Sequence, residues 1–156
     1  MTPLYVASQN GRTDIVHALI AAHAGVDIAM DAATPLYVAS QNGHTDIVRA
    51  LIAARAGVHI ALNDGRTPLF DASQRGHTDI VNALIAAHVG VDIAANDGVT
   101  PLFIASRKGH IDIVHALIAV RAEVYIARND GWKPLHIARF KGHYDIVHAL
   151  VAAGAT

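Results

Sequence analysis

Histidine is the first residue type in this chain to suggest chemistry, because eleven histidines occur in 156 residues. Imidazole nitrogens ligate zinc and transfer protons near neutral pH. Four of the histidines, however, follow a glycine at one repeated position: His44, His77, His110 and His143. Packed helices lie about 8–10 Å apart, so equivalent side chains of neighbouring units cannot share a zinc ion about 2 Å from each ligand. We interpret these histidines as structural and expect no metal or cofactor.

The other candidate catalytic residues also recur from unit to unit. A second repeated position carries a mixture typical of an exposed helix face: His17, Arg49, Asn82, His115 and His148. Serines and aspartates recur as framework residues at Ser8, Ser40, Ser73 and Ser106 and at Asp14, Asp46, Asp79, Asp112 and Asp145. A residue present in nearly every unit serves the unit, whereas catalysis needs singular side chains that converge. We therefore predict that the protein is not an enzyme.

These residues are positioned by a repeat of about 33 residues. The five prolines, which are all that the chain has, lie 32, 33, 33 and 33 residues apart: Pro3, Pro35, Pro68, Pro101 and Pro134. A unit of this size cannot bury its apolar face alone and must stack on its neighbours. The period predicts a single domain over residues 1–156, with repeats at about 1–33, 34–66, 67–99, 100–132 and 133–156.

The third unit illustrates the elements that each repeat should contain. Thr67 can cap a short helix that begins at a proline and ends at Gly76. A second helix should follow, with an apolar stripe that includes Ile80 and Leu84. Alternating apolar residues then lead to Asn96-Asp97-Gly98, which is typical of a β-hairpin.

Thr-Pro-Leu-x-x-Ala and Gly-His at these offsets, repeated along essentially the whole chain, resemble the ankyrin repeat family. The resemblance implies an all-α repeat fold, an L-shaped solenoid of helix-turn-helix units with projecting β-hairpin fingers. It also implies a non-catalytic protein–protein interaction module. Partners of such modules bind the finger tips and the concave face of the inner helices.

The chain departs from the family pattern at the residue after Thr-Pro-Leu. The family's histidine remains only at His136, and the other units have an aromatic ring: Tyr5, Tyr37, Phe70 and Phe103. The hydrogen bond between threonine and histidine is therefore lost in most units. We expect ring packing between repeats to replace it.

The end of the second helix also departs from the pattern. Where the family has a helix-ending glycine, only Gly154 matches, and the other units have His23, Arg55, His88 and Arg121. Either the helix runs longer than usual or it ends through a different turn. The first junction is one residue short and reads Asp31-Ala32-Ala33. We predict a different turn type there and the loosest finger, because an alanine at positive φ costs about 1–2 kcal/mol.

A binding surface should lie where the repeats differ from one another. Three positions vary: the residue before Thr-Pro, the middle of the first helix and its end. From the last three repeats they give the predicted partner-binding set: Arg66, Asp71, Arg75, Val99, Ile104, Arg107, Lys108, Trp132, Ile137, Phe140 and Lys141. Asp71 and Arg75, four residues apart, could instead simply satisfy each other.

The last two repeats combine aromatic and aliphatic residues with basic ones, including Arg128, which is typical of an interface hot spot. The alternative is that Trp132 and Phe140 pack on neighbouring fingers or shield the end of the array. The expected partner is a protein or peptide with acidic and apolar groups.

Charge and hydropathy argue against other classes of partner. The net charge is −1, and residues 1–98 carry five Lys/Arg against nine Asp/Glu, whereas residues 99–156 carry seven against four. A nucleic-acid partner is therefore disfavoured. The chain has no apolar run long enough to span a membrane and no cysteine. These features favour a cytoplasmic, intracellular protein.

Two alternatives remain open at this point. The ends of the solenoid are not well capped, although the last repeat is more polar (Lys133, Arg139, Lys141, Tyr144) and could form a partial cap. Copies of the chain could therefore associate end to end as a structural array. The close similarity of the repeats also fits an engineered or consensus-like scaffold that has no natural partner.

Overall fold

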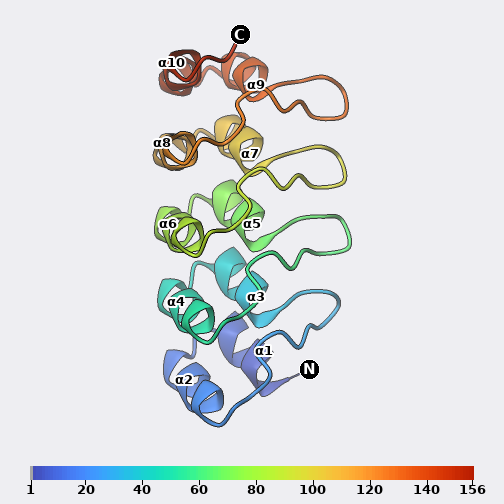
Figure 1. Ribbon diagram of the computed structural model, residues 1–156, viewed down its shortest axis with the longest axis vertical. Helices are drawn as coiled ribbons and strands as arrows, with labels where there is room; N and C mark the ends of the chain where they lie inside the picture. The colour runs from blue at the N-terminus through green and yellow to red at the C-terminus, as the bar shows by residue number, and fades with distance from the viewer. Residues whose placement is uncertain (1) are drawn as a thin grey trace.

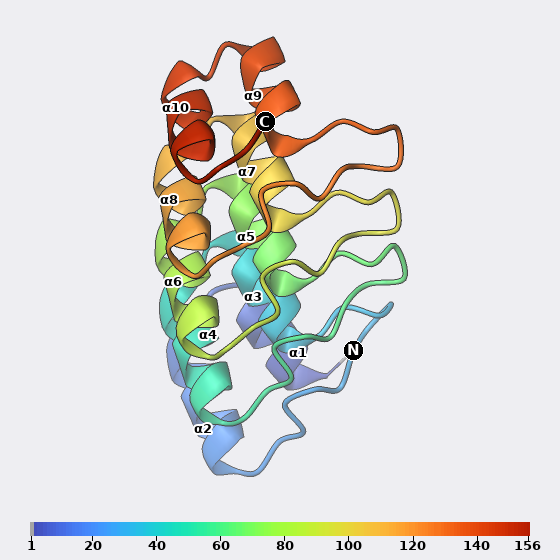
Figure 2. The ribbon, with the colours of Figure 1, turned by 45° about the horizontal axis from the view of Figure 1, so that its top comes forward.

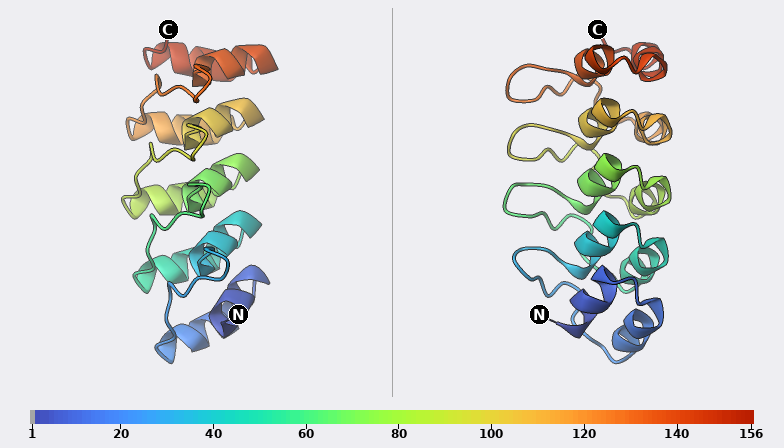
Figure 3. Two further views of the ribbon diagram at one scale, coloured as in Figure 1. Left: turned by 90° about the vertical axis from the view of Figure 1, so that its right-hand side faces the viewer. Right: turned by 180° about the vertical axis from the view of Figure 1, so that it is seen from behind.

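The computed structural model describes residues 2–156 and shows helix pairs stacked in chain order into an elongated solenoid (Figure 1). The first helices of the repeats are α1 (Pro3–Gln9), α3 (Pro35–Asn42), α5 (Pro68–Arg75), α7 (Pro101–Lys108) and α9 (Pro134–Lys141). The second helices are α2 (Thr13–Ala21), α4 (Thr45–Ala53), α6 (Thr78–Ala86), α8 (Ile111–Ala119) and α10 (Tyr144–Ala152). The two sets form two layers, and the loops that join successive repeats project from the side of the first helices (Figures 2 and 3). The all-α repeat fold expected from the sequence is confirmed.

Each first helix begins and ends as the repeated motif predicts. The Thr34 hydroxyl accepts a hydrogen bond from the Tyr37 amide at 3.1 Å, and a proline occupies the first helical position. Gly43 ends α3 with a φ of 82°. A Cβ at Gly43 would also lie only 2.9 Å from the His77 ring of the next repeat. Glycine therefore satisfies both the left-handed backbone and the close approach of the neighbouring histidine.

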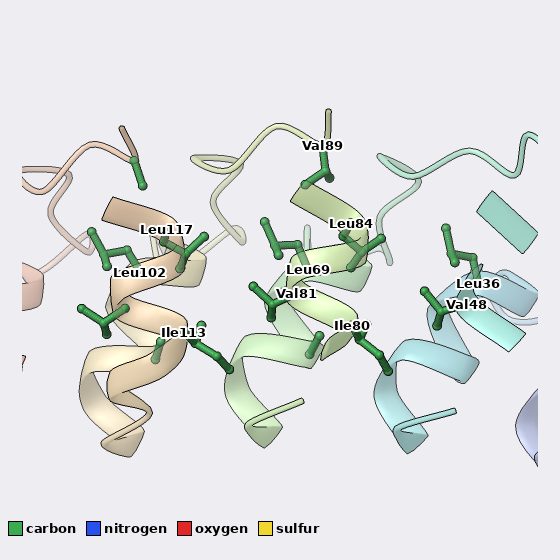
Figure 4. Close-up of a cluster of buried hydrophobic side chains, with 14 of the residues drawn as sticks. Leu36, Val48, Leu69, Ile80, Val81, Leu84, Val89, Leu102, Ile113 and Leu117 are labelled. Atoms are coloured by element: carbon green, nitrogen blue, oxygen red, sulfur yellow. The ribbon is translucent and has the colours of Figure 1, made fainter. Parts of the chain in front are cut away.

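The main core lies between successive helix pairs (Figure 4). Leu36, Leu69 and Leu102 occupy the same position in successive first helices, and all are fully buried. Ile80 and Ile113 do the same in the second helices. Each repeat packs its apolar face against the next repeat, so a face that a single unit would leave exposed is buried in the stack.

The second helices end at the usual place, so both sequence-based alternatives, a longer helix and a different turn, were wrong. The residues at the expected glycine position take the left-handed conformation themselves, with φ values of 58° at His23, 64° at Arg55, 58° at His88 and 63° at Arg121. At Arg55 the backbone forms the paired hydrogen bonds of a Schellman motif, from Arg55 N to Ile52 O at 2.9 Å and from Ala56 N to Leu51 O at 3.0 Å. Four side-chain-bearing residues therefore hold a conformation that glycine adopts without strain.

The four connecting loops, residues 22–33, 54–66, 87–99 and 120–132, are the fingers, and over residues 2–156 they form no paired β-strands. The expected β-hairpins are reduced to turn-tipped loops, such as the one closed by hydrogen bonds from Leu62 N to Arg66 O and from Gly65 N to Leu62 O, both at 2.9 Å. A single isolated bridge joins Met30 and Ala33 in the first finger. The strand expectation fails because the finger tips close after one turn, and the Asn96 and Asn129 amides donate to the preceding finger instead of across their own.

The first finger has the different turn type that its shortened sequence predicts. Asp31 and Ala32 both have positive φ, at 50° and 67°. Two consecutive left-handed residues are typical of a type I′ turn. Ala32 therefore adopts the conformation that costs about 1–2 kcal/mol for a residue with a Cβ.

The aromatic rings that replace the family's histidine pack in clusters that join neighbouring repeats, as expected. Tyr5 and Tyr37 belong to one buried cluster, with Val38, and Phe70 and Phe103 belong to a second, with Val99, Ile104 and Ile137. Trp132 packs against the second cluster. Within residues 2–156, no helix is both long and apolar enough to cross a membrane.

Candidate functional site

The candidate surface consists of the fingers and the exposed parts of the first helices beside them. Successive fingers are tied together by asparagines at one repeated position. The Asn96 amide donates to Asp64 O at 2.8 Å, and its side chain donates to Asn63 O at 3.0 Å. Asn129 repeats both bonds one finger later, to Asp97 O and Asn96 O, each at 3.0 Å. Fingers two to four therefore form one hydrogen-bonded row.

The aspartate of each of these fingers shapes its tip. The carboxylates of Asp64, Asp97 and Asp130 accept hydrogen bonds from the backbone amide two residues later, at 3.1, 3.1 and 3.2 Å. The signal for this row was visible in the sequence as Asn-Asp-Gly in three fingers, but sequence reasoning used it only as a turn signal. That these side chains join neighbouring fingers and shape their tips was not predicted from the sequence.

The glycine-linked histidines, interpreted from the sequence as structural or solvated, form contacts between repeats. Nε2 of His44, His77 and His110 lies 3.1, 3.2 and 3.2 Å from the carbonyl oxygen of a glutamine one repeat earlier. Nε2 of His143 lies 3.3 Å from the Arg107 carbonyl. The histidines on the second helices, by contrast, are exposed. No group of three or more potential ligands among residues 2–156 is arranged to hold a metal ion.

An aromatic and basic patch lies over the last two repeats, and we define it as Arg107, Lys108, Trp132, Phe140 and Lys141. The Trp132 and Phe140 rings meet edge to face, with centroids 5.4 Å apart and planes at 87°. Phe140 is 71% exposed, whereas Trp132 is half-buried. The Lys141 ammonium lies 5.6 Å from the centre of the Phe140 ring. A large apolar side chain is thus presented to solvent beside cations, the composition of an interface anchor.

Arg128, which sequence reasoning placed at the edge of this surface, is committed to its own finger. Its Nε donates to Asp130 Oδ1 at 2.9 Å, and its guanidinium lies 5.6 Å from the centre of the Phe103 ring. The hydrogen bond from Arg128 lowers the pKa of Asp130 to about 2. Arg128 therefore stabilises the fourth finger and contributes less free charge to a partner.

The structure divides the predicted partner-binding residues into two groups. Seven keep exposed or half-exposed side chains: Arg66, Arg75, Arg107, Lys108, Trp132, Phe140 and Lys141. Four are buried: Asp71, Val99, Ile104 and Ile137, with exposed fractions of 0, 2, 0 and 7%. Val99 belongs to the third finger, and the other three lie in the first helices; all four present almost no surface. The three apolar ones instead support Trp132 and Phe103 from below.

A cavity of about 330 Å³ lies between the second and third fingers. Its lining residues are Asp64, Arg66, Phe70, Ala95, Asn96 and Asp97. Arg66 links this cavity to the buried Asp71, because Arg66 Nη1 lies 3.6 Å from Asp71 Oδ1. The same guanidinium donates through Nε to Asp64 Oδ2 at 2.7 Å.

Comparison with known families agrees with this architecture. A family model described as ankyrin repeats (3 copies) matches residues 4–97 and 87–156. Together the two matches cover nearly the whole chain. Among curated proteins, none matches it.

Proposed function

This chain belongs to the ankyrin repeat family, and we propose that it binds a partner protein through the fingers and first helices of its last two repeats. Ankyrin repeats are generally protein–protein interaction modules and are typically non-catalytic. Location inside the cell, which is common in the family, is part of the proposal. The partner should present acidic and apolar groups.

The observation that carries the proposal is Phe140, a large apolar side chain that is 71% exposed and contacts Trp132 edge to face. Exposed aromatic side chains supported by a second ring and rimmed by cations are typical of binding hot spots. Lys141 is exposed beside it, and Lys108 is exposed at the end of α7. Residues 99–156 also carry seven basic against four acidic side chains, which favours an acidic partner by electrostatic complementarity.

The surface is preformed, which supports a binding role. The Asn129 bonds to Asp97 O and Asn96 O tie the fourth finger to the third. The fourth finger carries Trp132, so its position is fixed before a partner arrives. A surface ordered in advance loses less conformational entropy on binding.

Selection from a random peptide library displayed on phage tests this function. We expect the enriched peptides to combine Asp or Glu with aliphatic or aromatic residues. Phe140→Ala should weaken their binding roughly tenfold or more, as truncation of a hot-spot residue does. Tyr144→Ala is the matched control, because Tyr144 is 68% exposed but lies on α10 outside the patch.

The proposal fails if no peptide is enriched, or if both variants bind the enriched peptides as the parent does. In that case the second candidate, end-to-end association into a structural array, takes precedence. Exposed apolar side chains on the outermost second helices favour it: Ile15 is 51% exposed on α2, and Val151 is 49% exposed on α10. Association should then appear as a sedimentation coefficient that rises with protein concentration. An engineered scaffold without a natural partner would show neither behaviour.

A further inference from the structure

Asp71 differs from every other residue at its position in the repeat. The middle of the first helix carries an apolar side chain in the other four units: Val6, Val38, Ile104 and Ile137. Asp71 is nevertheless fully buried. Val38 belongs to the apolar cluster on one side and Ile104 to the cluster on the other. Asp71 is thus the one carboxylate set into an otherwise apolar row beneath the fingers.

Neither carboxylate oxygen of Asp71 accepts a hydrogen bond from residues 2–156. The cation within 4 Å of it is Arg66, whose Nη1 lies 3.6 Å from Oδ1, which is too far for a hydrogen bond. Arg75, four residues along α5, acts on Asp71 through its charge but forms no ion pair with it. Arg66 is also engaged by Asp64 at 2.7 Å. Burying a carboxylate without hydrogen bonds is strongly unfavourable. An apolar residue at this position would avoid that penalty, so the aspartate calls for a functional explanation.

The cavity between the second and third fingers is connected to this carboxylate through Arg66, and Asp71 itself does not line it. Arg66 and Phe70, the residue that precedes Asp71, both line it. Asp64 and Asp97 line the same cavity, so the lining and the Asp71 carboxylate next to Arg66 carry three negative charges, whereas Arg66 is the one cation of the lining. The space therefore favours a further positive charge.

We propose that this cavity is a subsite for an arginine side chain of the partner, whose guanidinium displaces that of Arg66 and donates to both oxygens of Asp71. A guanidinium suits the site because its planar fork can donate two parallel hydrogen bonds to one carboxylate. Phe70, which is 5% exposed and lines the cavity, adds an aromatic contact for the guanidinium. Asp64 already accepts a hydrogen bond from Arg66 and keeps it paired after the partner's arginine displaces it from Asp71.

This subsite deepens the proposed function and rests on it. The partner would place acidic and apolar groups on the patch around Phe140 and an arginine between fingers two and three. Repeats three to five would then read one extended segment, with Asp71 as its specificity-determining residue. An ammonium group, which lacks the planar fork, should bind more weakly.

The test uses the whole chain with carbon-13 label in its aspartate carboxyl groups. N-acetylarginine methylamide is titrated while the Asp71 carboxyl resonance is followed by NMR. The neutral citrulline analogue, matched in shape, and the lysine analogue are the controls. We expect a saturable shift with the arginine compound, binding roughly tenfold weaker with the lysine compound and no shift with the citrulline compound.

Two variants sharpen the outcome. Arg66→Ala removes the competing cation and should tighten binding of the arginine compound several-fold. Asp71→Val restores the apolar row, as at Val38, and should abolish the site while the fold persists. The proposal is overturned if Arg66→Ala weakens binding of the arginine compound, or if that compound does not shift the Asp71 resonance. In either case Arg66 is the residue that pairs with Asp71. The Arg66→Ala variant decides the question even if Asp71→Val does not fold.

This experiment fails separately from the test of the proposed function. The small probes do not reach the patch, so Phe140→Ala should leave the arginine titration unchanged. If no peptide binds at Phe140 but the arginine compound still shifts the Asp71 resonance, the proposed surface is excluded and the cation site stands. If peptides bind at Phe140 but the arginine compound gives no shift, the surface stands and the subsite is excluded.

Discussion

Nε2 of His110 lies 3.2 Å from the carbonyl oxygen of Gln74, which places the bond between the fourth repeat and the third. The same bond joins His77 to Gln41. Gly76 leaves room for the His110 ring, because a Cβ at Gly76 would lie 2.8 Å from Cε1 of His110. The glycine of one repeat therefore contacts the histidine of the next repeat, and this contact explains why the Gly-His sequence recurs.

Replacing one of these histidines should weaken the stack. His110→Ala removes a hydrogen bond between repeats and leaves the Gln74 carbonyl without that donor, so we expect the free energy of unfolding to fall by about 1–2 kcal/mol. His115→Ala, on the exposed face of the same helix, is the control and should change it by less than about 0.5 kcal/mol. Urea denaturation followed by circular dichroism measures both. Equal decreases in the free energy of unfolding of the two variants would contradict this structural role of His110.

Restoring glycine at the end of a second helix should stabilise the protein. His88 holds a φ of 58°, which is strained for a residue with a Cβ. His88→Gly relieves that strain, partly offset by the greater freedom of glycine in the unfolded chain. We expect a net gain of about 0.5–1 kcal/mol in the free energy of unfolding. His88→Ala keeps the Cβ and should give no such gain, so a similar gain in both variants would refute the explanation.

The hydrogen-bonded row of fingers should be visible by amide hydrogen exchange. The Asn96 and Asn129 amides donate to the preceding finger, at Asp64 O and Asp97 O. Asn63 occupies the equivalent position, but the first finger, with its different turn, gives its amide no such acceptor among the described residues. We expect the Asn63 amide to exchange at least about tenfold faster than the other two, since a protected amide must first open. Comparable rates would show that the first finger is no looser than the rest.

Stability should depend on pH through Asp71. Burial raises the pKa of this carboxyl to about 6 from 3.8, against the opposing effect of the Arg75 guanidinium. Between pH 4 and 6 the native state then binds more protons than the unfolded state, so the free energy of unfolding decreases as pH rises through this interval. The full change is on the order of 3 kcal/mol. Above pH 6 this contribution is constant.

Asp71→Val isolates this effect. The variant should be more stable than the parent at pH 7 and should lose the decline between pH 4 and 6. Arg66 and Arg75 carry the cations that act on Asp71. Chemical denaturation at a series of pH values gives the profile, and an unchanged profile in the variant would assign the pH dependence to another group.

The fold could be predicted from the sequence because its determinants are local and repeated. Thr34, Pro35 and Gly43 fix the ends of a first helix through caps and backbone angles that depend on neighbouring residues only. The helix end at Arg55 could not be predicted, because packing in the stack imposes a left-handed conformation that the residue type disfavours.

The surface was only partly predictable. Phe140 and Lys141 are exposed, as expected, because they lie at the end of the first helix. Ile104 and Val99 vary from repeat to repeat and so resembled contact residues, but both are buried in one apolar cluster. Their burial depends on how each finger leans on the next, which is set by contacts about 33 residues apart, such as Asn129 to Asn96. No local pattern encodes that geometry.

Trp132 is the only tryptophan in the chain, so its indole N–H resonance reports directly on the proposed binding surface. The decisive measurement titrates an acidic peptide from the library selection and follows this resonance together with the backbone amides. Binding at the patch predicts saturable shifts at Trp132 and along the fourth finger and α9, with the amides around His148 on α10 unchanged. Shifts confined to α10, with the Trp132 indole unperturbed, would contradict the proposed site.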